Sequence, residues 1–172
     1  MKRNALRRAR SACVVLAILT AAACSRDFHE RLEADEATVM PDDHPAMQAA
    51  MAKAKSSLDQ FLQIAAAPAP HLGSFAVKIG ISDQGSTEYF WITPFSVQDG
   101  HFSGMLSNTP QLVSNVSEGQ VVKFDRGDIV DWTYMDSQQH RMYGNYTACA
   151  LLQQEGPEAM QEMRKNYGLQ CD

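Results

Sequence analysis

The stretch DIVDWTYM, residues 128–135, alternates apolar and polar side chains and reads as a β-strand. One face of such a strand carries Val130, Trp132 and Tyr134, while Asp131 lies on the other face. Two roles are open for Asp131. It is either a general acid whose pKa is raised beside aromatic surface, or a structural carboxylate next to a core tryptophan. We expect Trp132 to anchor the strand in the core.

The segments around this strand predict an α+β fold. A helix-start signal at residues 42–45 precedes an apolar stripe at three- and four-residue spacing from Met47 to Ala65. Five further strand segments follow at close spacing: 74–82, 87–95, 99–108, 120–124 and 141–152. A short helix is predicted within residues 156–168. We therefore expect an N-terminal amphipathic helix packed on a bent, mainly antiparallel sheet of about five to six strands, with a short C-terminal helix.

The beginning of the chain has the pattern of an export signal. Five basic residues precede an apolar run from Ala12 to Ala23, which is too short to span a bilayer. Small residues lead directly into Cys24, so the segment resembles a bacterial lipobox, although Ala21 stands where that pattern usually has Leu. The resemblance implies cleavage before Cys24 and lipid attachment to it. The alternative is an ordinary secretory peptide cut near Ala23.

The expected organisation follows from that signal. Residues 1–23 form the signal peptide, 24–40 an acidic tether, and 41–172 a single domain. Ser25 after the cysteine favours the periplasmic face of the outer membrane over retention in the inner membrane. The partner that this predicts is the membrane itself, through lipid on Cys24.

The charge of the chain argues against nucleic acid as a partner. Loss of residues 1–23 removes five of the 15 basic residues and none of the 20 acidic ones, which leaves a net charge of about −10. Nucleic-acid binding needs a basic surface.

The remaining cysteines beyond Cys24 are Cys149 and Cys171, an even pair that favours a disulfide in an oxidising compartment. Such a bridge would tie the tail to the predicted strand 141–152 and stabilise the fold by roughly 3 kcal/mol.

Several motifs in order resemble a known family. They are E-x-F-W at residues 88–91, G-x-L-x-N-x-P at 104–110 and I-x-DW at 129–132. Together with the helix segment and residues 144–152, they resemble the YegJ-like family, domain of unknown function 2314, over about residues 41–152. This chain departs from the pattern at Cys149, where members often carry a basic residue, and at Val130, which separates Ile129 from the Asp-Trp pair. The resemblance implies a fold and an envelope setting, and it transfers no catalytic residue.

The candidate catalytic residues are weak. Glu88 and Asp131 are acids beside aromatic strand segments, and two carboxylates across a cleft hydrolyse glycosidic bonds. The competing interpretation is structural: such an acid either pairs with a neighbouring Arg, which for Asp131 is Arg141 on the next strand, or caps backbone N–H groups. Gly104 is expected to allow a bend or a close strand approach, and Asn108 to hold a turn through its own backbone. The five histidines are scattered, so no metal site and no cofactor are predicted.

Other aromatic residues suggest a binding surface on a bent sheet. The residues proposed for it are Trp91, Asp131, Trp132, Tyr134, Arg141 and Tyr143. Our leading hypothesis is a non-enzymatic envelope lipoprotein that binds an envelope protein or glycan, or that acts as a small inhibitor or protective factor. The alternatives are a cell-envelope hydrolase that uses Glu88 and Asp131, and a purely structural envelope protein.

Overall fold

A computed structural model describes residues 40–171 of the chain, so the predicted signal peptide, Cys24 and nearly all of the predicted tether lie outside the described residues. The elements along the chain are α2 (Pro45–Ala66), β1 (Leu72–Asp83), β2 (Ser86–Gln98), β3 (His101–Leu106), β4 (Val121–Phe124), η1 (Arg126–Asp128), β5 (Ile129–Asp136), β6 (Arg141–Gly144), α3 (Tyr146–Glu155) and α4 (Pro157–Tyr167). One six-stranded sheet has the order β4-β3-β2-β1-β5-β6, and all neighbouring strands are antiparallel. The predicted α+β class is confirmed.

One predicted element is wrong. The strand expected at residues 141–152 ends at Gly144, and residues 146–155 form helix α3 instead. Gly144 and Asn145 both have positive φ, at 76° and 56°, which is left-handed backbone that a strand does not continue through. The buried residues after the turn then follow at helical spacing, and they are Thr147, Cys149, Ala150 and Leu152.

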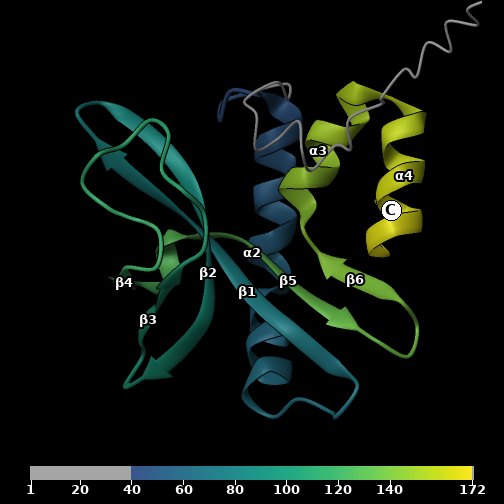
Figure 1. The fold of residues 1–172 in the computed structure, drawn as a ribbon, viewed down its shortest axis with the longest axis horizontal. Helices are drawn as coiled ribbons and strands as arrows, with labels where there is room; N and C mark the ends of the chain where they lie inside the picture. Colours follow the sequence, from purple (N-terminus) through teal and green to yellow (C-terminus); the bar gives the residue numbers. More distant parts are fainter. Residues whose placement is uncertain (1–39, 172) are drawn as a thin grey trace, which may run out of the picture.

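The sheet is split between its two central strands. β1 and β2 pair from the turn at Asp83–Ser86 back to Val77–Ile92. Beyond that point the first residues of β1 pair only with β5, while the last residues of β2, Phe95–Gln98, pair with β3. The two strands therefore diverge, and Figure 1 shows β1 and β2 running apart with α2 beside the opening.

Helix α2 fills the angle between the two halves of the sheet. The ring of Phe61, only 1% exposed, lies 4.9 Å from the Trp132 ring and 6.1 Å from each of Phe75 and Phe95. The indole Nε1 of Trp132 donates to the carbonyl oxygen of Ala54 at 3.0 Å. The predicted core role of Trp132 is therefore confirmed, because the ring packs on the helix and its one donor is satisfied.

A bulge in β5 changes which side chains share a face. Ile79 of β1 pairs with Ile129, but Lys78 pairs with Asp131, so Val130 is an extra residue on β5. Directly paired residues lie on the same face, and Ile129 therefore joins Trp132 in the core. The strict alternation expected from the sequence placed Val130 on that face, and the bulge is the reason that this expectation fails.

The turn at Gly144 generates the first prediction. A Cβ on this residue would overlap the carbonyl oxygen and indole carbons of Trp132, in addition to the strained φ. We expect Gly144→Ala to lower the free energy of unfolding by more than about 3 kcal/mol in urea denaturation. Gly127→Ala is the control, because its Cβ would meet nothing within 4 Å. Equal stability of the two variants would contradict the packing described at this turn.

Candidate functional site

An open groove lies where β1 and β2 diverge. Its volume is about 630 Å³, and it is bounded by the last turns of α2, the start of β1 and the second half of β2. The principal residues that line it are Leu62, Ala65, Phe75, Thr93, Phe95 and Val97. The groove follows directly from the split sheet, because the helix closes only one side of the angle.

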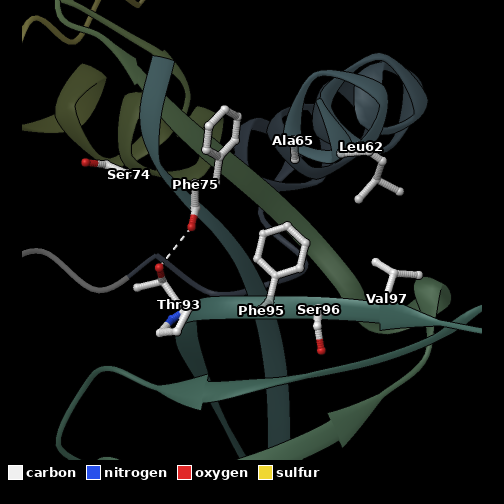
Figure 2. Close-up of a pocket in the computed structure, with 10 residues that line it drawn as sticks. Leu62, Ala65, Ser74, Phe75, Thr93, Phe95, Ser96 and Val97 are labelled. Carbon is white, nitrogen blue, oxygen red and sulfur yellow. Dashed lines mark hydrogen bonds between the residues drawn. The ribbon is translucent and has the colours of Figure 1, made fainter. Parts of the chain in front are cut away.

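The lining of the groove is apolar. Figure 2 shows Phe95 and Val97 projecting from β2 toward helix α2, where Leu62 points back at them, while Ser96 points to the other side of the strand. Val97 is 50% exposed and is one of the most exposed large apolar side chains among the described residues. The apolar surface that Leu62 and Val97 offer is therefore open to solvent or to a ligand.

Polar groups at this site are few and uncharged. The hydroxyl of Thr93 donates to the carbonyl oxygen of Phe75 at 2.9 Å and bridges the two strands where they begin to part (Figure 2). None of the described residues that line the groove is charged. Such a surface can bind apolar groups, but it offers no acid, base or nucleophile for a reaction.

Glu88 lies away from the groove and holds a loop. Its carboxylate accepts from the backbone N–H groups of Gln111, Leu112 and Val113 at 2.8–3.2 Å. Asp83, at the end of β1, holds the next residue of the same loop. The backbone N–H and the hydroxyl of Ser114 donate to its carboxylate, and these hydrogen bonds lower the pKa of Asp83. These acids fasten residues 107–120 over the end of the β1–β2 hairpin, a structural use of carboxylates.

Two other motif residues, Asn108 and Gly104, also hold the loop and the strands in place. Asn108 does not bond its own backbone as expected. Its side-chain oxygen accepts from the backbone N–H of Trp91 at 2.9 Å and ties the loop to β2. Gly104 confirms the expected close approach, since a Cβ there would lie 2.8 Å from the carbonyl oxygen of Pro94 and would overlap Ile92.

Asp131 is a buried cap for helix α3. Its exposed fraction is 0%, and its carboxylate accepts from the backbone N–H and the hydroxyl of Thr147 at 2.8 and 2.7 Å. Thr147 lies in the first turn of α3, where the flanking Asn145 gives no side-chain cap. β5 therefore supplies the negative charge that a helix N-terminus favours.

Lys78 completes this cluster on the same face of the sheet. Its Nζ donates to the hydroxyl oxygen of Thr147 at 3.1 Å and lies 5.2 Å from the centre of the Trp91 ring. Burial raises the pKa of Asp131, while the nearby Lys78 charge and the hydrogen bonds from Thr147 and Trp132 oppose that rise. Burial likewise lowers the pKa of Lys78, opposed by Asp131. The two charges stabilise each other inside the fold.

The predicted pairing of Asp131 with Arg141 is wrong. Arg141 lies opposite Asp136 in the β5–β6 pairing, on the face that carries Tyr134 and Tyr143, whereas Asp131 faces the other way beside Lys78. The sequence spacing placed both residues on neighbouring strands, but register and the bulge put them on opposite faces.

The structure does not gather the candidate residues into one site. By register Glu88 pairs with Ile81 on the core face, and Asp131 pairs with Lys78 on the opposite face, so the two carboxylates do not share a cleft. Among the six residues proposed for a binding surface, Asp131, Trp132 and Tyr134 are buried. The groove escaped sequence reasoning because it depends on where two strands stop pairing.

Three further observations concern the disulfide, metal binding and membrane spans. A disulfide joins Cys149 to Cys171, with Cα atoms 5.3 Å apart, and Cys149 lies on helix α3 where the sequence predicted a strand. In residues 40–171 no group of three or more His, Cys, Asp or Glu side chains is arranged to hold a metal ion. None of the helices in that range has the length and apolar character needed to cross a membrane.

The cap at Asp131 gives the second prediction. Asp131→Asn removes the charge that faces Lys78 and weakens the cap of α3, so we expect the free energy of unfolding to fall by about 3 kcal/mol. Chemical denaturation measures it. Asp99→Asn, at an exposed turn residue with φ 51°, is the control and should change stability by less than about 0.5 kcal/mol. An unchanged stability for Asp131→Asn would remove the structural role assigned here.

Comparison with known proteins places the chain in a family. The profile of the family described as "Uncharacterized protein conserved in bacteria (DUF2314)" matches residues 43–171. The chain is also 37% identical over 122 residues to "Uncharacterized protein YegJ" of Escherichia coli (strain K12), which covers 71% of this chain and 77% of that relative. No solved structure matches it. This chain therefore belongs to the DUF2314 family.

Proposed function

We propose that this protein is a non-enzymatic binding module of the bacterial cell envelope, anchored by lipid on Cys24, which takes an apolar segment of a partner protein in the groove between β1 and β2. The groove itself is the observation that carries the proposal. It is open, about 630 Å³ in volume, and lined by aromatic and aliphatic side chains with hydroxyl groups near them. Protein pockets that bind ligands have this character.

A protein segment fits the groove better than a glycan does. Sugar hydroxyls need many hydrogen-bond partners, and leaving them unpaired is costly. The described lining offers three hydroxyl side chains, those of Ser74, Thr93 and Ser96, and no carboxylate or side-chain amide. Thr93 already donates to Phe75. Apolar side chains of a peptide instead match Leu62 and Val97 directly.

The carboxylate-pair hydrolase is the less favoured function. It requires Glu88 and Asp131 to face one substrate, but the register puts them on opposite faces of the sheet. Each carboxylate is also engaged by backbone N–H groups of a loop or helix that it holds. Both acids therefore serve the fold, and the proposed module acts by binding alone.

The disulfide supports an envelope setting. Structural disulfides persist in the periplasm and are rare in the cytosol, where thiols are kept reduced. The bridge between Cys149 and Cys171 fastens the C-terminal stretch to helix α3. Together with the lipobox-like sequence at Cys24, it favours a folded domain held outside the cytoplasm.

The third prediction tests the groove by photo-crosslinking in living cells. A photoreactive amino acid replaces Ala66, at the groove, or Ala52, an exposed residue on the same helix that does not line the groove. We expect a saturable protein adduct from position 66 and no more than background from position 52. The adduct is identified by mass spectrometry.

Blocking variants give this experiment its control. Val97→Asp puts a charge into the groove, whereas Val121→Asp puts one on β4, where Val121 is 68% exposed outside the groove. We expect the Val97 variant to reduce the adduct at least about tenfold, since an unpaired charge against apolar surface is costly, and the Val121 variant to leave it unchanged. The proposed site is refuted if both variants give the wild-type adduct.

The fourth prediction concerns the anchor. Cells that express the protein and are fed labelled palmitate should incorporate the label into the chain, and Cys24→Ser should abolish incorporation and release the protein from membranes. Cys149→Ser serves as the control, because it removes a disulfide cysteine and should leave the label in place. Label on the Cys24 variant, or none on the wild type, would overturn the proposed lipid anchor.

A further inference from the structure

The second half of β2 is an open strand edge inside the groove. Phe95–Gln98 pair with β3 on one side, whereas the pairing of β2 with β1 ends at Ile92. The groove lies on the other side of this stretch, and Phe95 and Val97 are among the residues that line it. One wall of the groove is therefore a strand edge as well as an apolar surface.

The turn after Gln98 determines which backbone groups face the groove. Its two residues have φ of 51° and 81°, and a two-residue turn of this kind joins a pair that exchanges both backbone hydrogen bonds. That pair is Gln98 with His101, and every second pair repeats the arrangement, so Ser96 is also bonded to β3. The N–H and C=O groups of Phe95 and Val97 consequently face away from β3, toward the groove.

These groups of Phe95 and Val97 have no hydrogen-bond partner within residues 40–171. The start of β1, across the groove, is different. Its pairing with β5 shifts register between Gly73 and Ala76, and the carbonyl oxygen of Phe75 accepts from the Thr93 hydroxyl at 2.9 Å. The edge that can take another strand is therefore that of β2.

The two outer edges of the sheet are protected against such pairing. β4 carries the charged Lys123, and the edge of β6 is covered because Met142 pairs with Leu169 and donates its N–H to the carbonyl oxygen of Gly168. Lysine side chains and covering segments are common means of keeping an edge from pairing with another chain. The stretch Phe95–Gln98 carries no charge, and no other described strand pairs with it on the groove side.

An extended polypeptide is the chemical match for this edge. Its backbone donors and acceptors on one side recur at every second residue, as those of Phe95 and Val97 do. Every second side chain of an added strand would lie on the face of Phe95 and Val97, toward Leu62 of α2 (Figure 2). Apolar residues at every second position of that strand would fill the groove.

We propose that the partner segment binds as an added β-strand along Phe95–Gln98, with its alternate apolar side chains in the groove. This inference rests on the proposed function and names the chemistry of the partner, which is an extended segment of another protein with apolar residues at every second position. Backbone hydrogen bonds to β2 supply affinity, and the groove selects the side chains.

Amide hydrogen exchange tests the open edge in the wild-type protein by itself. Unpaired amides exchange faster than amides bonded within a sheet. After correction for intrinsic rates, we expect the amides of Phe95 and Val97 to exchange at least about tenfold faster than that of Ser96. Equal protection of the three amides would show that the edge is already paired and would overturn the inference.

A matched pair of proline variants tests the pairing with the partner. Val97→Pro removes one N–H from the open edge and keeps an apolar side chain. Val121→Pro makes the same change on the outer edge of β4, where the pairing of Val122 with Gly104 leaves the N–H of Val121 directed outward. We expect Val97→Pro to reduce the photo-adduct from position 66 at least about tenfold, as loss of a hydrogen bond predicts, and Val121→Pro to leave it unchanged.

The outcomes separate the binding mode from the proposed function. If Val97→Pro keeps the wild-type adduct while Val97→Asp loses it, the groove binds its partner without strand pairing, so the inference fails and the proposed function stands. No adduct from the wild type overturns both. An adduct of twice the mass of the chain would identify a second copy and overturn the partner named here.

Mass spectrometry and a folding control complete the test. Fragmentation of the adduct should place the crosslink in a segment with apolar residues at every second position, and a crosslink in a helical or uniformly polar segment would contradict strand addition. Circular dichroism checks that Val97→Pro is folded. The exchange rates of Phe95, Ser96 and Val97 in the wild type decide the inference even if that variant does not fold.

Discussion

The packing of Phe61 into the angle between β1 and β2 is the contact on which the rest of the structure depends. The two strands stop pairing at Val77 and Ile92, so the sheet opens into two halves that share only the paired part of these strands. Phe61 contacts aromatic rings of both halves, and Trp132 bonds the helix backbone beside it. Without that ring, the opened sheet would expose its core instead of a shallow groove.

The acids near the aromatic strands serve the fold in a consistent way. Asp131 caps helix α3, Glu88 holds the loop after β3, and Asp83 holds the same loop one step further along. In each case a strand side chain satisfies backbone N–H groups of a segment that crosses it. Acids used in this way hold a loop or the start of a helix against the sheet. These acids belong to the framework of the fold, and the proposed binding role rests on the groove instead.

Sequence patterns predicted the parts of the fold that repeat along the chain. Helix α2, the hairpin of β1 and β2 and the core position of Trp132 all follow from periodicity. Two departures from that repetition were missed: the left-handed backbone at Gly144 that ends β6, and the extra Val130 that moves Ile129 onto the core face. Both depend on contacts between segments distant in sequence.

The candidate site was harder to predict for the same reason. No motif marks the end of pairing between two strands, and the groove residues Leu62, Phe75 and Val97 look like ordinary core positions in the sequence. Arg141 and Tyr143 were selected as surface residues, and they line a small cavity whose other walls come from α2, α3 and the C-terminal stretch, which the sequence did not bring together.

The divergence of β1 and β2 is the central claim, and cross-strand nuclear Overhauser effects between the two strands test it most directly. We expect them along the paired region from Asp83–Ser86 to Val77–Ile92 and around the hydrogen bond from Thr93 to Phe75, and none further along the two strands. If the strands stayed paired, the same register would bring Ser74 opposite Phe95 and Gly73 opposite Ser96. Effects between those residues would show a closed sheet without the groove, and would contradict the account.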